Sequence, residues 1–280
     1  MNCAAMIDTA DMTEDAFLGG QLRLKQKRSG HRAGHDAILL AAATDARAGD
    51  RVVDFGAGIG TAGLALARRV AGIRLSLVEI DPELAELARG NALANAIAAE
   101  TIVLDVTADA QAFAASGLVS DTVDAVLMNP PFNDPGRHRG SPDQARHTAH
   151  VAAEETLLAW VHAARRVLRS NGVLTMIWRA DGLADVLAAL SRGFGSLSIL
   201  PVHGEAGQPA IRVLVRAVKG GRAPTRLLPG LMLNHTSRSS NSAVTEILEG
   251  RAALPLVEPR GLTGEAIPAA APAGRSGGSP

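Results

Sequence analysis

The sequence predicts an α/β protein whose sheet is seven-stranded, mostly parallel and closed by a C-terminal antiparallel hairpin. From residue 51 onward, short runs rich in β-branched residues alternate with alanine- and leucine-rich stretches. This is the pattern of a parallel sheet covered by helices. The last two runs are joined by the short segment HGEAGQP and no helix, so they should pair antiparallel. A chain of 280 residues is long enough to bury a full core.

The individual elements follow from local patterns. Strands are predicted at 51–55, 75–80, 101–105, 123–128, 172–178, 196–202 and 211–218. Helices are predicted at 61–70, 82–95 and 152–169. The second helix opens with Pro82, which suits the first helical position because no N–H is needed there. The third carries Arg165, Arg166 and Arg169 opposite its apolar face, and Asn171-Gly172 is expected to end it.

Composition restricts the partners and the compartment. The formal net charge is +0, with 28 basic and 28 acidic side chains, so no global field attracts the protein to nucleic acid or membrane. The single cysteine, Cys3, can form neither an internal disulfide nor a cysteine-based zinc cluster. Apolar stretches are too short or too interrupted to span a bilayer. We therefore expect a cytoplasmic protein with no metal site.

One catalytic domain is predicted, over residues 17–253. Residues 1–16 are expected to form a flexible leader, and residues 17–48 a segment of their own before the first strand of the sheet. Residues 254–280 are expected to form a tail that is disordered from about residue 264, because alanine, proline, glycine and serine dominate it.

A glycine-rich loop follows the first predicted strand of the sheet. The segment DFGAGIG, residues 54–60, contains Gly56, Gly58 and Gly60 and leads at once into a helix. Glycines permit a tight turn and close approach of a ligand, and the helix N-terminus adds unpaired N–H donors. The loop predicts a cradle for a nucleotide-like cofactor. Residues 58–63 also fit the dinucleotide fingerprint G-x-G-x-x-G, so NAD and S-adenosylmethionine both remain candidates at this point.

Acidic residues stand near the ends of the neighbouring strands. Glu79 ends the second strand, where an acid can accept hydrogen bonds from the ribose hydroxyls of either cofactor. Asp105 ends the third and could hold the adenine amine, or serve only as a cap or turn residue. Asp54 could orient the glycine loop or reach the amino group of the cofactor.

The tetrapeptide Asn129-Pro130-Pro131-Phe132 follows the fourth strand, at the edge where open α/β sheets bind ligands. The two prolines remove two N–H donors, so this stiff turn offers acceptors only. A planar amine is a poor nucleophile, and the Asn129 side-chain oxygen and the Pro130 carbonyl could accept its two N–H groups while Phe132 stacks on its ring. Asn129 is also a candidate cofactor contact. The pattern favours methyl transfer over NAD chemistry; the alternative is a plain turn after a strand.

With these motifs, the chain resembles the bacterial small-domain methyltransferases, most closely the tRNA adenine-N(6)-methyltransferases that modify tRNA(Val). The resemblance runs from about Phe17 to Ala253 and includes FLGGQLRLKQKRSGHRAGHDAILLAAA, DFGAGIG, VEIDPELAELARGNALAN, NPPF, HRGSPDQARHTAH and LLPGLML. It implies a Rossmann-like class I methyltransferase fold, S-adenosylmethionine as the cofactor, and an adenine amine in RNA, in particular tRNA, as the acceptor.

The resemblance also implies that residues 17–48 cover the methionine end of the cofactor, with Arg32, Gly34 and Asp36 near the site. Asp36 could instead simply begin a helix. Phe132 stands where many relatives that work on adenine or glutamine have tyrosine, and guanine-modifying relatives also have phenylalanine. A guanine amine of rRNA, a protein glutamine amide, and a non-catalytic RNA-binding protein that retains cofactor affinity therefore stay open.

Two basic clusters flank the predicted cleft and could hold RNA phosphates. The first contains Arg23, Lys25, Lys27, Arg28 and Arg32, and the second Arg137, His138, Arg139, Arg146 and His147. The alternative for each residue is a solvated loop.

Overall fold

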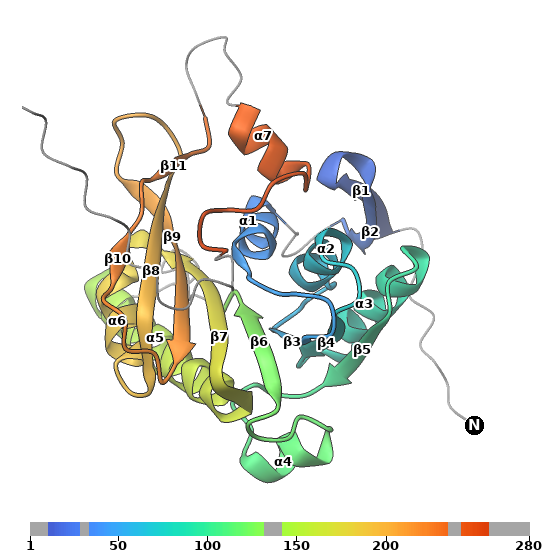
Figure 1. Ribbon diagram of the computed structural model, residues 1–280, viewed down its shortest axis with the longest axis horizontal. Coiled ribbons are helices and arrows are strands. Elements are labelled where there is room, and N and C mark those ends of the chain that lie inside the picture. The colour runs from blue at the N-terminus through green and yellow to red at the C-terminus, as the bar shows by residue number, and fades with distance from the viewer. Residues whose placement is uncertain (1–10, 29–33, 132–141, 235–241, 258–280) are drawn as a thin grey trace, which may run out of the picture.

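A computed structural model describes residues 11–28, 34–131, 142–234 and 242–257 (Figure 1). Its main sheet has the strand order β10-β8-β9-β7-β6-β3-β4-β5, and β11 pairs with β8. The strands are β3 (Arg51–Phe55), β4 (Arg74–Glu79), β5 (Ala99–Val103), β6 (Val123–Met128), β7 (Leu168–Arg179), β8 (Phe194–His203), β9 (Ala210–Lys219), β10 (Arg226–Leu227) and β11 (Leu231–Met232). Strands β3 to β7 run parallel, and β9 is antiparallel to both β7 and β8. The seven predicted strands and the closing hairpin are confirmed, and two further short strands, β10 and β11, which were not predicted, pair with β8.

The helices are α1 (His35–Ala43), α2 (Thr61–Arg69), α3 (Pro82–Ala94), α4 (Ala110–Ala115), α5 (Pro142–Val167), α6 (Leu183–Leu190) and α7 (Ser242–Leu248), with short 3-10 helices η2 (Leu18–Gly20) and η4 (Ala180–Gly182). Helix α3 begins as predicted, because Asp81 caps it by accepting the N–H groups of Glu83 and Leu84. Helix α5 differs from the prediction: it begins earlier and ends at Val167. The chain then enters β7, so Asn171 and Gly172 lie in that strand and end no helix.

An N-terminal hairpin was not predicted. Strands β1 (Met12–Phe17) and β2 (Leu22–Lys27) pair antiparallel from Met12–Lys27 to Phe17–Leu22. In β2, Leu22 and Leu24 are fully buried, which anchors the hairpin on the core. The predicted flexible leader is therefore wrong for residues 12–16. Its acidic composition is typical of a solvated leader, and only the pairing with β2 gives it order.

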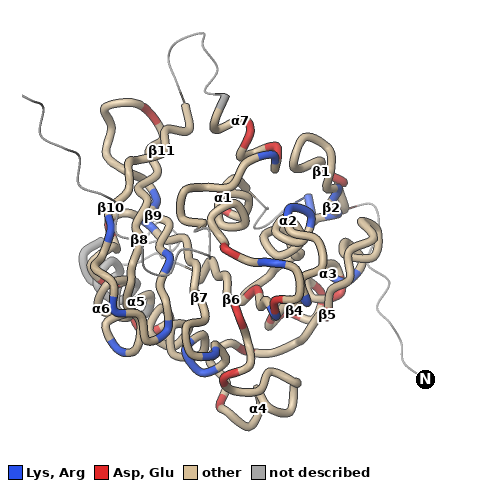
Figure 2. The backbone as a smooth tube through the Cα atoms, viewed as in Figure 1, with Lys and Arg blue, Asp and Glu red and all other residues tan. Residues whose placement is uncertain are grey.

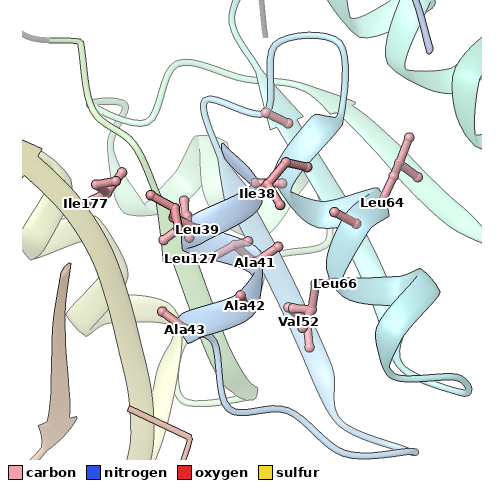
Figure 3. Close-up of a cluster of buried hydrophobic side chains, with 14 of the residues drawn as sticks. Ile38, Leu39, Ala41, Ala42, Ala43, Val52, Leu64, Leu66, Leu127 and Ile177 are labelled. Atoms are coloured by element: carbon pink, nitrogen blue, oxygen red, sulfur yellow. The ribbon is translucent and has the colours of Figure 1, made fainter. Parts of the chain in front are cut away.

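Two apolar clusters cover the two faces of the sheet. One joins the hairpin, α1, α2, α3 and α7 to the sheet, and Figure 3 shows part of it, with Leu39 of α1 beside Leu127 of β6. The other joins α4, α5 and α6 to the opposite face. This is a three-layer α/β architecture. Among the described residues, no helix is both long and apolar enough to cross a bilayer.

The C-terminal boundary also differs from the prediction. Leu254 and Leu256 are buried, and the Leu254 amide donates to the Ala42 carbonyl at the end of α1, at 2.9 Å. Residues 254–257 thus belong to the packed domain, and the tail predicted from residue 254 begins too early. Two leucines separated by one residue are a weak signal in a proline-rich context. The part of the tail from residue 258 lies outside the described residues.

Candidate functional site

The glycine loop begins where β3 ends, and its glycines are required for different reasons. Gly56, Gly58 and Gly60 have φ values of +66°, +56° and +89°, a region that L side chains rarely adopt. A Cβ on Gly56 would come within 2.4 Å of the Trp160 ring, so this glycine permits close packing. A Cβ on Gly58 would meet nothing within 4 Å. Gly58 therefore faces open space in which a ligand can approach the backbone.

Asp54, in β3, holds the segment after the glycine loop by a hydrogen bond. Its side chain is buried, and Oδ2 accepts the amide N–H of Gly63, in the first turn of α2, at 2.8 Å. Burial raises the pKa of Asp54 to about 7; the Gly63 N–H opposes this shift, and the negative charge of Glu79 adds to it. Of the two roles predicted for Asp54, this geometry matches the orientation of the glycine loop.

Glu79 lies at the end of β4 and contacts the same loop. Its Oε2 accepts the Gly58 N–H at 2.8 Å, and Oε1 accepts the N–H groups of Ile80 and Asp81 at 2.9 and 3.0 Å. The side chain is 7% exposed. A carboxylate oxygen can accept more than one hydrogen bond, so Glu79 keeps capacity for a ligand hydroxyl beside the open space at Gly58.

Asp105 lies two residues beyond β5, which ends at Val103; the prediction that Asp105 ends this strand is therefore wrong. Its Oδ1 accepts the backbone N–H and the hydroxyl of Thr107, both at 2.7 Å. This is a side-chain-stabilised turn. Asp105 is exposed, so the same carboxylate can also contact a ligand above the edge of the sheet.

Asn129, Pro130 and Pro131 follow β6 directly, and Phe132 lies outside the described residues. In the sheet, Phe55 of β3 pairs with Met128 of β6, so the first residues after these strands, Gly56 and Asn129, lie side by side. The Asn129 Oδ1 is buried and has no hydrogen-bond partner among the described residues. A buried acceptor without a donor costs about 1–3 kcal/mol, so a donor from a ligand would offset a real penalty here.

The segment before the sheet contributes an ion pair. Gly34 precedes α1, and Asp36 lies in its first turn, where Oδ2 accepts Nε of Arg212 in β9 at 2.9 Å. Arg212 pairs with Arg179, the last residue of β7, so Asp36 lies at the carboxyl edge of the sheet. Sequence reasoning missed Arg212, because its partner is 176 positions away. Arg32 lies outside the described residues.

The first predicted basic cluster is largely neutralised. Arg23 pairs with Glu14 at 3.4 Å and Lys27 with Glu83 at 2.7 Å, while Lys25 lies opposite Glu14 in the hairpin. Arg28 is exposed. The second cluster, which includes Arg137, Arg139 and Arg146, falls outside the residues whose side chains are described.

Two asparagines absent from the predicted site, Asn91 in α3 and the C-cap residue Asn95, hold the hairpin, and Asn91 also contacts the glycine loop. Asn91 accepts the Lys25 N–H and donates to the carbonyls of Lys25 and Ile59, at 2.8, 3.1 and 3.0 Å. Asn95, one helical turn later, accepts the Arg23 N–H at 3.0 Å and donates to the Arg23 carbonyl at 2.7 Å. Two asparagines four residues apart at the end of a predicted helix were the available sequence signal for this role, because asparagine is a poor helix former and residues at this spacing face the same side.

Comparison with known proteins gives consistent matches. The model of the methyltransferase small domain family matches residues 31–204. A protein of Porphyromonas gingivalis named tRNA1(Val) (adenine(37)-N6)-methyltransferase is 31% identical over 180 residues, which is 62% of this chain and 69% of that protein. A protein of the same name from Dickeya chrysanthemi is 28% identical over 77% of this chain and 83% of its own length.

Among solved structures, a predicted O-methyltransferase from Agrobacterium tumefaciens superposes with a TM-score of 0.65 and 32% identity. The match covers 78% of this chain and 98% of that one. The sequence and structure comparisons therefore agree on one fold and one reaction type.

Proposed function

The chain belongs to the methyltransferase small domain family, and we propose that its methyl acceptor is the exocyclic N6 amine of an adenine in tRNA. The protein is a class I, S-adenosylmethionine-dependent methyltransferase. Two observations support this choice of methyl acceptor: the chemistry of the turn after β6, and the base that the relatives are named to modify.

The glycine loop and its acidic neighbours suit S-adenosylmethionine. The open space at Gly58 gives room for a ligand against the backbone, and Glu79 can accept hydrogen bonds from ribose hydroxyls. Asp105 can accept from the adenine amine. Asp54, Gly56 and Gly60 act on the loop itself, by holding its shape. When bound, S-adenosylmethionine supplies an electrophilic methyl group on a positively charged sulfur.

The turn after β6, which offers hydrogen-bond acceptors only, is the main support for an amine as the methyl acceptor. The Asn129 Oδ1, buried and without a donor among the described residues, can accept one N–H of an exocyclic amine, and the Pro130 carbonyl the other. Two such hydrogen bonds fix the orientation of the amine. They also make its nitrogen lone pair more available for attack on the methyl group. Positioning of this kind supplies much of the rate when no covalent intermediate is needed. A hydroxyl acceptor has only one hydrogen to donate and would leave one of the two oxygens without a partner.

The exocyclic amine of an RNA base offers the two N–H donors that the two acceptors of this turn require. Phe132, the next residue after the turn, would stack on an extruded base. Both curated relatives described above are named for the N6 position of adenine 37 in a tRNA. A cytoplasmic location would follow from a tRNA substrate.

The sharpest experiment compares Asn129→Ala with Asn129→Asp. Single-turnover methylation is measured on tRNA from a strain that lacks the protein. The alanine variant should be slower by about 10²–10³-fold, the loss typical of one well-placed polar group. The aspartate variant keeps an acceptor oxygen and should retain clearly more activity. Equal activity in the wild-type protein and Asn129→Ala would refute the role of this side chain.

Mass spectrometry of the product tests the acceptor itself. N6-methyladenosine in tRNA supports the proposal. N2-methylguanosine in rRNA, a methylated protein glutamine or a 2′-O-methyl group would each replace it with another acceptor. Tight binding of S-adenosylhomocysteine without methyl transfer to any RNA would favour a non-catalytic RNA-binding protein.

A further inference from the structure

A basic groove lies at the amino-terminal edge of the sheet, at the opposite end of the strands from Asn129. Its volume is about 700 Å³. It is bordered by the last turns of α5, the start of β7, the end of β9 and the segments that lead into β6 and β8; its lining includes Asp121, His162, Arg165, Arg166, Asn171 and Lys219. Figure 2 shows several basic positions around the lower ends of β7, β8 and β9.

The charge of this groove is unbalanced. Three of its lining side chains are cationic, Arg165, Arg166 and Lys219, and Asp121 is the one acid among them. The whole chain has a formal net charge of +0, so the positive charge here is a local feature. A groove lined by one sign of charge attracts ligands of the opposite sign.

Two of the cations are held by the protein itself. Lys219 Nζ donates to the Asp121 Oδ1 and to the Leu168 carbonyl, both at 2.6 Å. Arg166 donates to the Ala108 carbonyl at 3.1 Å, and its guanidinium lies 5.2 Å from the centre of the Phe113 ring. These contacts place both charges at the wall of the groove.

Arg165 differs, because its side chain has no hydrogen bond or ion pair within the described part of the chain. Its side chain lies across Gly193: a Cβ there would come within 2.6 Å of the Arg165 Cδ and 3.1 Å of Nη1. His162, three residues earlier on α5, likewise has no hydrogen-bond partner within the described part. Arg165 is thus a positioned guanidinium whose five N–H donors remain available.

The other end of the molecule is poorly suited to phosphates. The carboxyl edge carries Asp54, Glu79 and Asp105 around the cofactor site, and the turn after β6 offers acceptors only. In the hairpin, Arg23 and Lys27 are already paired with acids. Within the described residues, the amino edge gathers three cationic side chains in one groove, whereas the hairpin leaves Arg28 exposed as a single arginine.

We propose that this groove binds backbone phosphates of the RNA substrate, with Arg165 as its principal contact. The inference rests on the proposed function, since it requires an RNA acceptor. Strand β6 has six residues, so the two edges are about 20 Å apart at roughly 3.3 Å per residue. If the rise of a B-form DNA strand, about 3.4 Å per nucleotide, is taken as a guide, roughly six nucleotides cover that distance. An RNA with its base at Asn129 can therefore reach Arg165.

The test is the salt dependence of tRNA binding by the full-length protein with S-adenosylhomocysteine present. Arg165→Gln is compared with Arg89→Gln, a control that removes an exposed arginine on α3 paired with Glu86. For Arg165→Gln, the plot of log affinity against log salt should flatten by about 0.7–0.9, the value for one phosphate contact. The dissociation constant at low salt should rise several-fold, and that of Arg89→Gln should stay close to wild type.

The outcomes separate this inference from the proposed function. An unchanged slope in Arg165→Gln, or an equal change in Arg89→Gln, would overturn the phosphate contact even if tRNA is methylated. If Arg165→Gln flattens the slope as expected but the wild-type protein methylates no tRNA, the result counts against the proposed function alone. Both variants are checked by circular dichroism, since the comparison requires folded proteins.

Discussion

Asn91 in α3 donates through Nδ2 to the carbonyl of Ile59, the residue between Gly58 and Gly60 of the cofactor loop, at 3.0 Å. The same side chain pairs with the backbone of Lys25 in the hairpin. One buried amide therefore connects the hairpin before the sheet to the loop proposed to hold the cofactor.

Asn91→Ala should weaken cofactor binding and destabilise the protein. The substitution leaves the Ile59 carbonyl and the Lys25 N–H without their partner, at a cost of about 1–3 kcal/mol for the buried bond to Ile59 and less for the partly buried bond to Lys25. Calorimetric titration with S-adenosylhomocysteine should show a dissociation constant raised about tenfold, because about 1 kcal/mol or more of loop order is lost. Asn95→Ala is the matched control: it breaks contacts to the hairpin and none to the loop, so it should leave this affinity close to wild type. Equal loss in both variants would contradict the coupling.

Asp54→Asn should remove a pH dependence of stability. The pKa of Asp54 is raised to about 7 in the folded protein, against an ordinary value of 3.8, so the folded state holds its proton more tightly than the unfolded state. The free energy of unfolding of the wild type should therefore fall as pH rises from about 4 to about 7, by at most about 1.4 kcal/mol per pH unit from this group, and stay level above. Asparagine keeps an oxygen for the Gly63 N–H and does not titrate. Urea unfolding across this pH range should show a smaller decline in the variant.

Gly58→Ala and Gly56→Ala should fail in different ways. A methyl group on Gly58 enters open space, so the variant should fold with a loss of about 1–2 kcal/mol from its positive φ. Its affinity for S-adenosylhomocysteine should nevertheless fall sharply, because the methyl group occupies the ligand's space. A methyl group on Gly56 meets the Trp160 ring at 2.4 Å and should destabilise the fold itself. Thermal unfolding and calorimetry together distinguish the two; wild-type affinity in Gly58→Ala would show that no ligand lies against this position.

Leu256→Ala should destabilise the domain, although the residue lies beyond the predicted boundary at residue 253. Its side chain is fully buried, and leucine-to-alanine changes in a core cost about 2–5 kcal/mol. A lower midpoint of urea unfolding, with an unchanged slope, is the expected observation. Leu227→Ala provides the control, since Leu227 is 71% exposed and its loss should have little effect. Similar midpoints for the two variants would mean that residues 254–257 do not contribute to the core.

Local pattern was sufficient for much of this protein. Alternating β-branched and helical stretches predicted the seven main strands and their parallel or antiparallel direction, because strand period and connection type are set by nearby residues. The glycine loop, Glu79 and the tetrapeptide from Asn129 were predicted as site residues for the same reason. Each lies at or directly after the end of a strand, and parallel strands bring their carboxyl ends to one edge of the sheet.

Contacts between distant parts of the chain decided the rest. The order of the hairpin depends on pairing β1 with β2 and on the asparagines of α3, about 70 positions away. The partner of Asp36 is Arg212, and residues 254–257 are ordered by α1. No local pattern encodes such contacts, because their energy comes from groups that meet only after the sheet has formed. For the same reason, the sequence alone indicated the acceptor turn, while only the tertiary structure could show that the Asn129 oxygen is buried beside Gly56 without a donor among the described residues.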